Sequence, residues 1–242
     1  MRMARLGISR IALTAALVAV VAVAGIALYL TSAPPATSST TTTSTASGSL
    51  VVAMSPRSPL VAPGQTQNYS SVQLQTSGPA LNGTLTVRAF APAGITLSIG
   101  KTSVPLGDNP QSIPLSVRAS PGLSAGKYNF SLETSAAAIP ARNQTFTIDV
   151  VPVLVIIQNL AFHPQNLTVA VGTSVTWINL DSNIGCCDPG THNVVFLTGG
   201  NASSPELRRF DSWSYTFGAA GVVNYYCSIH PTIMNAAVHV TA

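Results

Sequence analysis

The segment Cys227-Ser228-Ile229-His230-Pro231-Thr232-Ile233-Met234 places a thiol, an imidazole and a thioether within one short stretch near the C-terminus. Upstream, His192-Asn193-Val194-Val195-Phe196 supplies a second imidazole at the start of an apolar run that is typical of a strand. One of these side chains starts a strand and the other three lie in a loop between two strands. The pattern therefore predicts four ligand side chains at one end of an all-β sandwich.

The types of ligand indicate which metal such a site binds. Two His and one Cys with a weak axial Met form the ligand set of a blue-copper, or type 1, electron-transfer site. Among the four Met, only Met234 lies near a His or Cys in sequence, and among the three Cys, only Cys227 lies inside the His/Met loop. If Met234 and Cys227 were ordinary core residues, the occurrence of all four ligands at usable positions would have no explanation.

Three segments carry a resemblance to a known family. Val169–Asn179, His192–Phe196 and Tyr225–Pro231 resemble the early strands and the ligand segments of plastocyanin-like cupredoxins, and the resemblance covers roughly residues 153–242. It implies a Greek-key β-sandwich that carries single electrons between larger redox proteins and performs no catalysis. It also implies one type 1 copper ion and two residues that hold the ligand loops together without binding the ion. The implied ligands are His192, Cys227, His230 and Met234, and the implied supporting residues, which join the two ligand loops, are Asn193 and Ser228.

The chain departs from its relatives at two places. Three residues separate His230 from Met234, whereas familiar plastocyanin and amicyanin loops hold four or two there. Residues 183–191 form an insertion before His192 that contains the adjacent pair Cys186 and Cys187. In an oxidising compartment such thiols are expected to oxidise. The pair is predicted to form a vicinal disulfide, with pairing between molecules or a second metal site with Asp188 and His192 as alternatives.

The N-terminal segment, residues 1–30, predicts export. Residues 11–30 contain no charge and are about long enough to cross a bilayer as a helix. Arg2, Arg5 and Arg10 precede this run, which predicts a single-pass anchor with the rest of the chain outside the cell membrane. A cleaved signal peptide is the alternative, although its apolar region is usually shorter. Either interpretation exports residues 50–242.

Two further segments separate the membrane from the copper domain. Residues 31–49 contain only Thr, Ser, Ala, Pro and Gly, which predicts a flexible tether. Residues 50–152 contain short alternating runs punctuated by Pro and Gly, which predict a β-sandwich. Ser124–Tyr128 resembles the tyrosine corner of immunoglobulin-like domains. This unit contains no His or Cys, so we expect a disulfide-free Ig-like spacer.

Composition excludes several classes of function. The formal charge of +4 includes three arginines of the membrane flank, and eight basic and seven acidic residues remain beyond residue 30. No basic cluster is longer than Arg208-Arg209, so the footprint of a nucleic-acid-binding protein is absent from the sequence. No nucleophile elbow and no His-x-His pair is present, so neither an enzyme nor a small-molecule substrate is expected. Six Asn-x-Ser/Thr sequons and the Thr-rich tether suggest an archaeal-type surface protein.

The C-terminal domain is expected to consist of strands throughout. The expected strands are residues 153–159, 167–178 with a turn at Gly172-Thr173, 191–198, 213–217, 222–227 and 236–241. His163 and His239 are expected on the surface, and Trp177 and Trp213 in the core. Tyr225 and Tyr226 are expected to face opposite sides of the sheet.

The sequence thus predicts a membrane-anchored, extracytoplasmic type 1 copper protein whose partners are redox proteins at the outer membrane surface. Two alternatives remain open at this point. One is copper storage, delivery or sensing without electron transfer. The other is a structural cell-surface protein with a repurposed cupredoxin domain.

Overall fold

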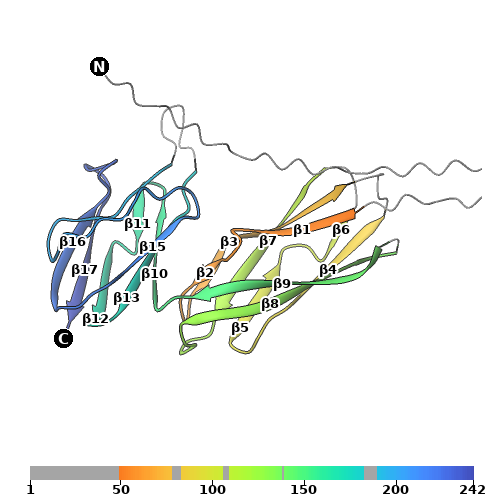
Figure 1. Cartoon of the computed structure of the whole chain (residues 1–242), viewed down its shortest axis with the longest axis horizontal. Helices are drawn as coiled ribbons and strands as arrows, with labels where there is room; N and C mark the ends of the chain where they lie inside the picture. The colour runs from red at the N-terminus through yellow and green to blue at the C-terminus, as the bar shows by residue number, and fades with distance from the viewer. Residues whose placement is uncertain (1–48, 78–82, 106–108, 138, 183–189) are drawn as a thin grey trace, which may run out of the picture. The chain divides into compact units, whose positions relative to one another are not determined.

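The computed structural model describes residues 49–77, 83–105, 109–137, 139–182 and 190–242 (Figure 1). Within these ranges every regular element is a β-strand, which confirms the all-β prediction. In the same ranges there is no helix long and apolar enough to cross a membrane. The predicted anchor, nearly all of the tether and the pair Cys186-Cys187 lie outside the described residues.

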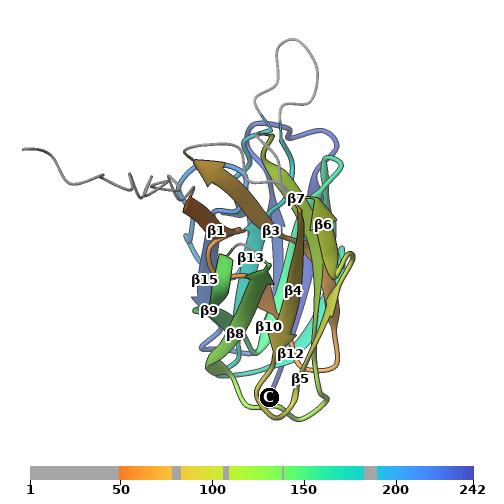
Figure 2. The same ribbon diagram turned by 90° about the vertical axis from the view of Figure 1, so that its right-hand side faces the viewer.

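Residues 49–150 form a sandwich of two sheets, with strand orders β1-β3-β7-β5 and β2-β9-β8-β4-β6. Figure 2 views these strands from the side of β4 and β6. The strands are β1 (Ser49–Ser55), β2 (Leu60–Val61), β3 (Thr66–Ser77), β4 (Thr84–Phe90), β5 (Ile95–Ile99), β6 (Ser103–Pro105), β7 (Gln111–Ala119), β8 (Gly126–Ala136) and β9 (Ile139–Val150).

Alternation of apolar and polar side chains builds this first sandwich. In β7, Ile113, Leu115 and Val117 are fully buried, while their sequence neighbours face outward. Because side chains point alternately to the two faces of a strand, one apolar face of each sheet covers the other. The Tyr128 hydroxyl donates to the carbonyl of Ser124 at 2.9 Å, which is the hydrogen bond of a tyrosine corner. The assignment of this sandwich to the Ig-like class stays a prediction.

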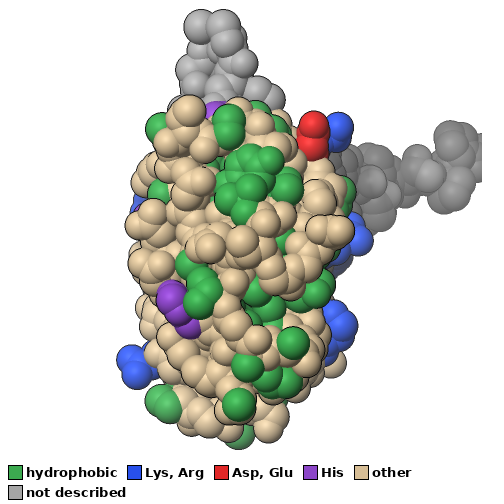
Figure 3. All heavy atoms as spheres, turned by 90° about the vertical axis from the view of Figure 1, so that its left-hand side faces the viewer, with side chains coloured by type: hydrophobic (Ala, Val, Ile, Leu, Met, Phe, Trp, Pro, Cys, Tyr) green, Lys and Arg blue, Asp and Glu red, His purple; other side chains and the backbone are tan. Residues whose placement is uncertain are grey.

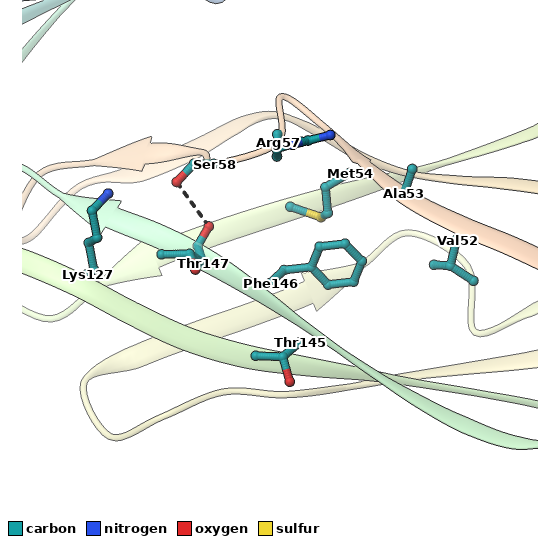
Figure 4. A pocket seen from close by; sticks show the side chains of 9 residues that line it. All are labelled: Val52, Ala53, Met54, Arg57, Ser58, Lys127, Thr145, Phe146 and Thr147. Carbon is teal, nitrogen blue, oxygen red and sulfur yellow. Dashed lines mark hydrogen bonds between the residues drawn. The ribbon is translucent and has the colours of Figure 1, made fainter. Parts of the chain in front are cut away.

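One pocket of about 610 Å³ opens on the first sandwich between β1 and β9 (Figure 4). Met54 and Phe146 form its apolar wall, and Arg57 and Lys127 contribute cations. The Ser58 hydroxyl donates to the carbonyl of Thr147 at 3.3 Å across its end. Lys127 forms an ion pair with Asp149 at 2.7 Å, which compensates the charge of that lysine.

The second sandwich begins at Val153, immediately after the first ends at Val150. Its two sheets have the strand orders β11-β10-β13-β15 and β12-β17-β16-β14. Two of its pairings are parallel, β10 with β13 and β12 with β17. The strands are β10 (Val153–Gln158), β11 (Ala161–His163), β12 (Asn166–Ala170), β13 (Ser174–Asn179), β14 (Val195–Phe196), β15 (Ser212–Thr216), β16 (Gly221–Tyr226) and β17 (Asn235–Thr241).

An aromatic core joins these two sheets. Trp177 is fully buried, and its ring centroid lies 5.3 Å from that of Trp213 and 5.6 Å from that of Tyr225. Tyr225 is buried and Tyr226 is partly exposed, so the two tyrosines face opposite sides of β16 as expected. Burial raises the pKa of Tyr225 to about 12. His163 and His239 are exposed, which confirms their predicted place on the surface.

The prediction of a strand over residues 191–198 is wrong for most of that range, because only Val195 and Phe196 pair with β16. The backbone before them bonds to a neighbouring loop instead of to a sheet. His192 forms an isolated bridge with Leu207, and the Val194 N–H donates to the Ser204 hydroxyl at 2.9 Å. Loop contacts therefore satisfy the backbone polar groups that a strand would have satisfied.

Candidate metal centre

Three predicted ligands meet at one end of the second sandwich. The Cys227 Sγ lies 3.8 Å from Nδ1 of His192 and 3.8 Å from Nδ1 of His230. The ligand atoms of these three residues all lie within 4.8 Å of one another. His192 precedes β14 and Cys227 follows β16, and because β14 and β16 are paired, residues distant in sequence converge here.

The C-terminal ligand loop, residues 227–234, is closed by its own main chain. The Cys227 N–H donates to the carbonyl of Met234 at 3.0 Å, and the Met234 N–H donates to the carbonyl of His230 at 3.1 Å. The His230 N–H donates to the carbonyl of Cys227 at 3.1 Å. Met234 is fully buried and directly precedes β17. The main chain of the loop thus returns Met234, the fourth predicted ligand, to the backbone of Cys227.

Asn193 and Ser228 join the two ligand segments. The Asn193 amide Nδ2 donates to the Ser228 hydroxyl at 2.8 Å, and its Oδ1 accepts the Ser228 N–H at 2.8 Å. The Asn193 N–H also points at the Cys227 Sγ from 3.4 Å. These contacts hold His192 and Cys227 at a fixed separation before any ion binds.

Asn179, a residue that the sequence analysis did not identify, links the end of β13 to the segment that carries His192 by hydrogen bonds. Asn179 is fully buried, and its Nδ2 donates to the carbonyls of Gly190 at 2.7 Å and Leu207 at 2.8 Å. Its Oδ1 accepts the N–H of Asp181 at 2.9 Å. The signal in the sequence that could have identified Asn179 is its place as the polar last residue of the buried strand β13. Asn179 therefore fixes the backbone on both sides of residues 183–189.

Asp181 was also missed by sequence reasoning, and no local motif reveals it. Its side chain is 6% exposed, and its Oδ2 lies 3.0 Å from Nε2 of His192. An ionised carboxylate only accepts hydrogen bonds, so this contact favours the tautomer with the proton on Nε2. In that tautomer the Nδ1 lone pair of His192 faces the Cys227 sulfur.

The site is enclosed on all but one side. His192, Cys227 and Met234 are buried, whereas His230 is partly exposed at the edge of the domain. The ligand loop around His230 carries no charged side chain, and its Ile229 and Ile233 are 40% and 58% exposed. The space-filling view of the β16 and β17 side shows Lys, Arg, Asp and Glu only near its margin (Figure 3).

The donor set fits a single soft or borderline metal ion. Thiolate and imidazole ligands suit copper, and a buried thioether adds a soft axial donor. Donor atoms 3.8 Å apart leave room for one ion at bond lengths of about 2.0–2.3 Å. His192 and His230 each turn Nδ1 toward the sulfur, so the lone pairs converge on that space.

Comparison with known proteins agrees with this geometry. Residues 151–241 match the model of the copper-binding proteins of the plastocyanin/azurin family. Amicyanin of Paracoccus denitrificans is 31% identical over 114 residues, which cover 46% of this chain and 76% of amicyanin. The chain belongs to the plastocyanin/azurin family of copper-binding proteins. Its second sandwich is therefore a cupredoxin domain, and its cofactor is copper.

Other relatives match part of the chain. Plastocyanin of Scenedesmus fuscus is 32% identical, with 29% of this chain and 76% of the plastocyanin covered. A solved structure of a reduced amicyanin variant is 33% identical over 37% of this chain and 81% of that chain, with a TM-score of 0.32. A purple cupredoxin from Nitrosopumilus maritimus is 32% identical over 37% of this chain and 99% of that chain, with a TM-score of 0.31.

Proposed function

We propose that this protein is a membrane-tethered, extracytoplasmic type 1 copper protein that carries single electrons between redox proteins. The observation that supports it best is the convergence of one buried sulfur and two imidazole Nδ1 atoms at 3.8 Å, with only His230 reaching the surface. Bound copper supplies the one-electron Cu(I)/Cu(II) couple. We assign Cys227, His192 and His230 as its strong ligands and Met234 as its axial ligand.

The protein contributes rigidity to this function. Strand ends, the Asn193–Ser228 pair and the closed ligand loop hold the donor atoms in place independently of the ion. A fixed ligand shell keeps reorganisation small when the electron arrives or leaves. Electrons enter and leave through His230, because the other assigned ligands are buried.

The sequence supports the proposed location at the outer face of the cell membrane. The uncharged run of residues 11–30, preceded by Arg2, Arg5 and Arg10, supports a single-pass anchor with the copper domain outside the cell. Membrane fractionation of cells expressing the full chain tests this, with carbonate extraction and protease protection. Release of a soluble, shortened chain would instead support a cleaved signal peptide.

A visible absorption and EPR spectrum after addition of one equivalent of Cu(II) to residues 50–242 tests the copper assignment. We expect an intense visible charge-transfer band and a narrow copper hyperfine splitting, because a cysteine thiolate bonds the ion directly. A pale sample with wide splitting would show tetragonal copper without Cys227 ligation, and the electron-transfer proposal would fail.

Met234→Leu is expected to retain the intense colour while raising the reduction potential. The substitution preserves the apolar volume of a fully buried side chain but removes the thioether, a donor that stabilises Cu(II). Protein-film voltammetry measures the potential. Met54→Leu, in the core of the first sandwich, is the matched control and should leave the potential unchanged. Equal potentials for the two variants would remove Met234 from the ligand set.

Electron self-exchange is expected to be nearly independent of salt. The ligand loop and strands β12, β14, β16 and β17 contain no Asp, Glu, Lys or Arg. Screening therefore has no charge of these segments to act on, and raising ionic strength from about 0.01 M to 1 M should change the rate less than about twofold. NMR line broadening in mixed oxidation states measures it. A change of about tenfold would place docking at the charged segment Glu206–Asp211 instead.

A further inference from the structure

The carboxylate of Asp181 holds three N–H groups at once. Its Oδ1 accepts the N–H of Asn159 at 2.7 Å, and its Oδ2 accepts the N–H of Leu160 at 3.1 Å. Oδ2 also lies 3.0 Å from the Nε2 of His192. Asp181 is 6% exposed and His192 is fully buried, so water does not compete for these bonds.

The two backbone donors belong to a tight turn that is itself unusual. Asn159 and Leu160 connect β10 to β11, and their φ angles are 55° and 58°. Positive φ at both positions is the requirement of a type I′ hairpin turn, which normally uses Asn-Gly or Gly-Gly. A leucine is strained in this region of backbone conformation. The Asp181 carboxylate stabilises the turn by binding both of its N–H groups, and the turn in return fixes the carboxylate.

Within the described residues, Asp181 forms no ion pair with a Lys or Arg side chain. Among the ion pairs found in the described part of the chain, the Asp181 side chain is joined only to His192. Its negative charge is therefore balanced by backbone dipoles and by the imidazole, and it acts directly on whatever the imidazole binds.

We propose that Asp181 is a positioning residue that fixes the Nε2–H tautomer and ring orientation of His192 and lowers the reduction potential of the copper centre. The tautomer leaves Nδ1 as the lone pair that faces Cys227, the orientation that a metal ligand requires. The fixed negative charge stabilises Cu(II) over Cu(I). The second part of this inference rests on the proposed function, and the first part does not.

The tautomer is tested on the copper-free protein of residues 50–242. Long-range ¹H–¹⁵N correlation spectra of the four histidines report which ring nitrogen carries the proton. Wild-type His192 is expected to be protonated at Nε2, with a strongly deshielded, slowly exchanging proton. A wild-type His192 protonated at Nδ1 would overturn the proposal without any variant, whether or not copper binds.

Asp181→Asn tests the charge and the acceptor together. The two turn N–H groups bond different carboxylate oxygens, and asparagine offers one acceptor oxygen in their place. With that oxygen kept on the shorter contact to Asn159, the amide NH₂ faces Nε2, and His192 is then expected to move its proton to Nδ1 in the copper-free protein. In the copper-loaded protein the potential should rise by about 59 mV or more, equivalent to a tenfold change in the ratio of Cu(I) to Cu(II) affinity. Asp181→Glu keeps the charge and the acceptor and should restore most of both properties.

Glu206→Gln is the matched control, because it removes the same charge from an exposed position of the same domain. It should change neither the tautomer nor the potential, since solvent screens its charge. Circular dichroism of each copper-free variant establishes that it is folded. A folded Asp181→Asn protein with wild-type tautomer and potential would overturn the proposal, and an Asp181→Glu protein that behaves like Asp181→Asn would reduce Asp181 to a packing role. Failure of the wild type to form a type 1 site would refute the proposed function and leave the tautomer result standing.

Discussion

Replacement of Cys227 with serine is expected to abolish the intense visible band of the copper-loaded protein. The band arises from charge transfer between the cysteine sulfur and Cu(II), and a serine hydroxyl neither ionises near neutral pH nor offers a soft donor. Cys227 is fully buried at the centre of the site, with both imidazole Nδ1 atoms 3.8 Å from its sulfur. No other described side chain can take its place, because the cluster of ligand atoms contains this one thiol.

Absorption and EPR spectra at one equivalent of Cu(II) measure the result. Cys186→Ser and Cys187→Ser are the matched controls and should keep the band, since neither thiol belongs to the assigned ligand set. Circular dichroism should show a folded protein in all three cases. A blue Cys227→Ser protein would exclude the assigned site.

Trp177→Ala is expected to destabilise the cupredoxin domain by about 3–5 kcal/mol, the range for large-to-small changes at buried aromatic positions. Trp177 is fully buried in β13, and its ring contacts Trp213, Tyr225 and Phe196 from three other strands. The substitution would leave a cavity that these aromatic neighbours cannot fill without leaving their own packing.

Urea unfolding of the copper-free protein measures this loss. Both tryptophans of the chain lie in the cupredoxin domain, so the fluorescence of Trp213 in the variant follows that domain alone. This is needed because two-domain proteins often unfold in more than one step. Leu197→Ala, at a position 60% exposed, is the control and should cost less than about 0.5 kcal/mol. A cost below about 1 kcal/mol for Trp177→Ala would contradict the packing described here.

The cupredoxin fold and the residues of the metal cluster could be predicted from the sequence because their signals are local. Cys227, His230 and Met234 share one loop, and the expected strands are short runs rich in β-branched and aromatic residues. The exception was the strand expected over residues 191–198. Its apolar pattern is genuine, but its backbone partners, Ser204 and Leu207, lie in a loop whose position no local pattern predicts.

The supporting residues could not be predicted for a related reason. Asp181 and Asn179 act across a turn or an insertion, and each is an ordinary polar residue at a strand end in the sequence. The turn at Asn159 and Leu160 carries no glycine, so it lacks the usual signal of a type I′ hairpin. Very short strands such as β2, β6 and β11 contain too few residues to show any period.

Because main-chain hydrogen bonds close the loop of residues 227–234, substitutions in the loop and substitutions in the sandwich can occur independently during evolution. These bonds join the loop's own residues, so its exposed positions can be exchanged between fixed ends without repacking the sheets below. The composition of these positions can then change the surface around the copper centre, while the sandwich sets stability. Divergent members of such a lineage can adapt to new redox partners through the loop alone and inherit the scaffold unchanged.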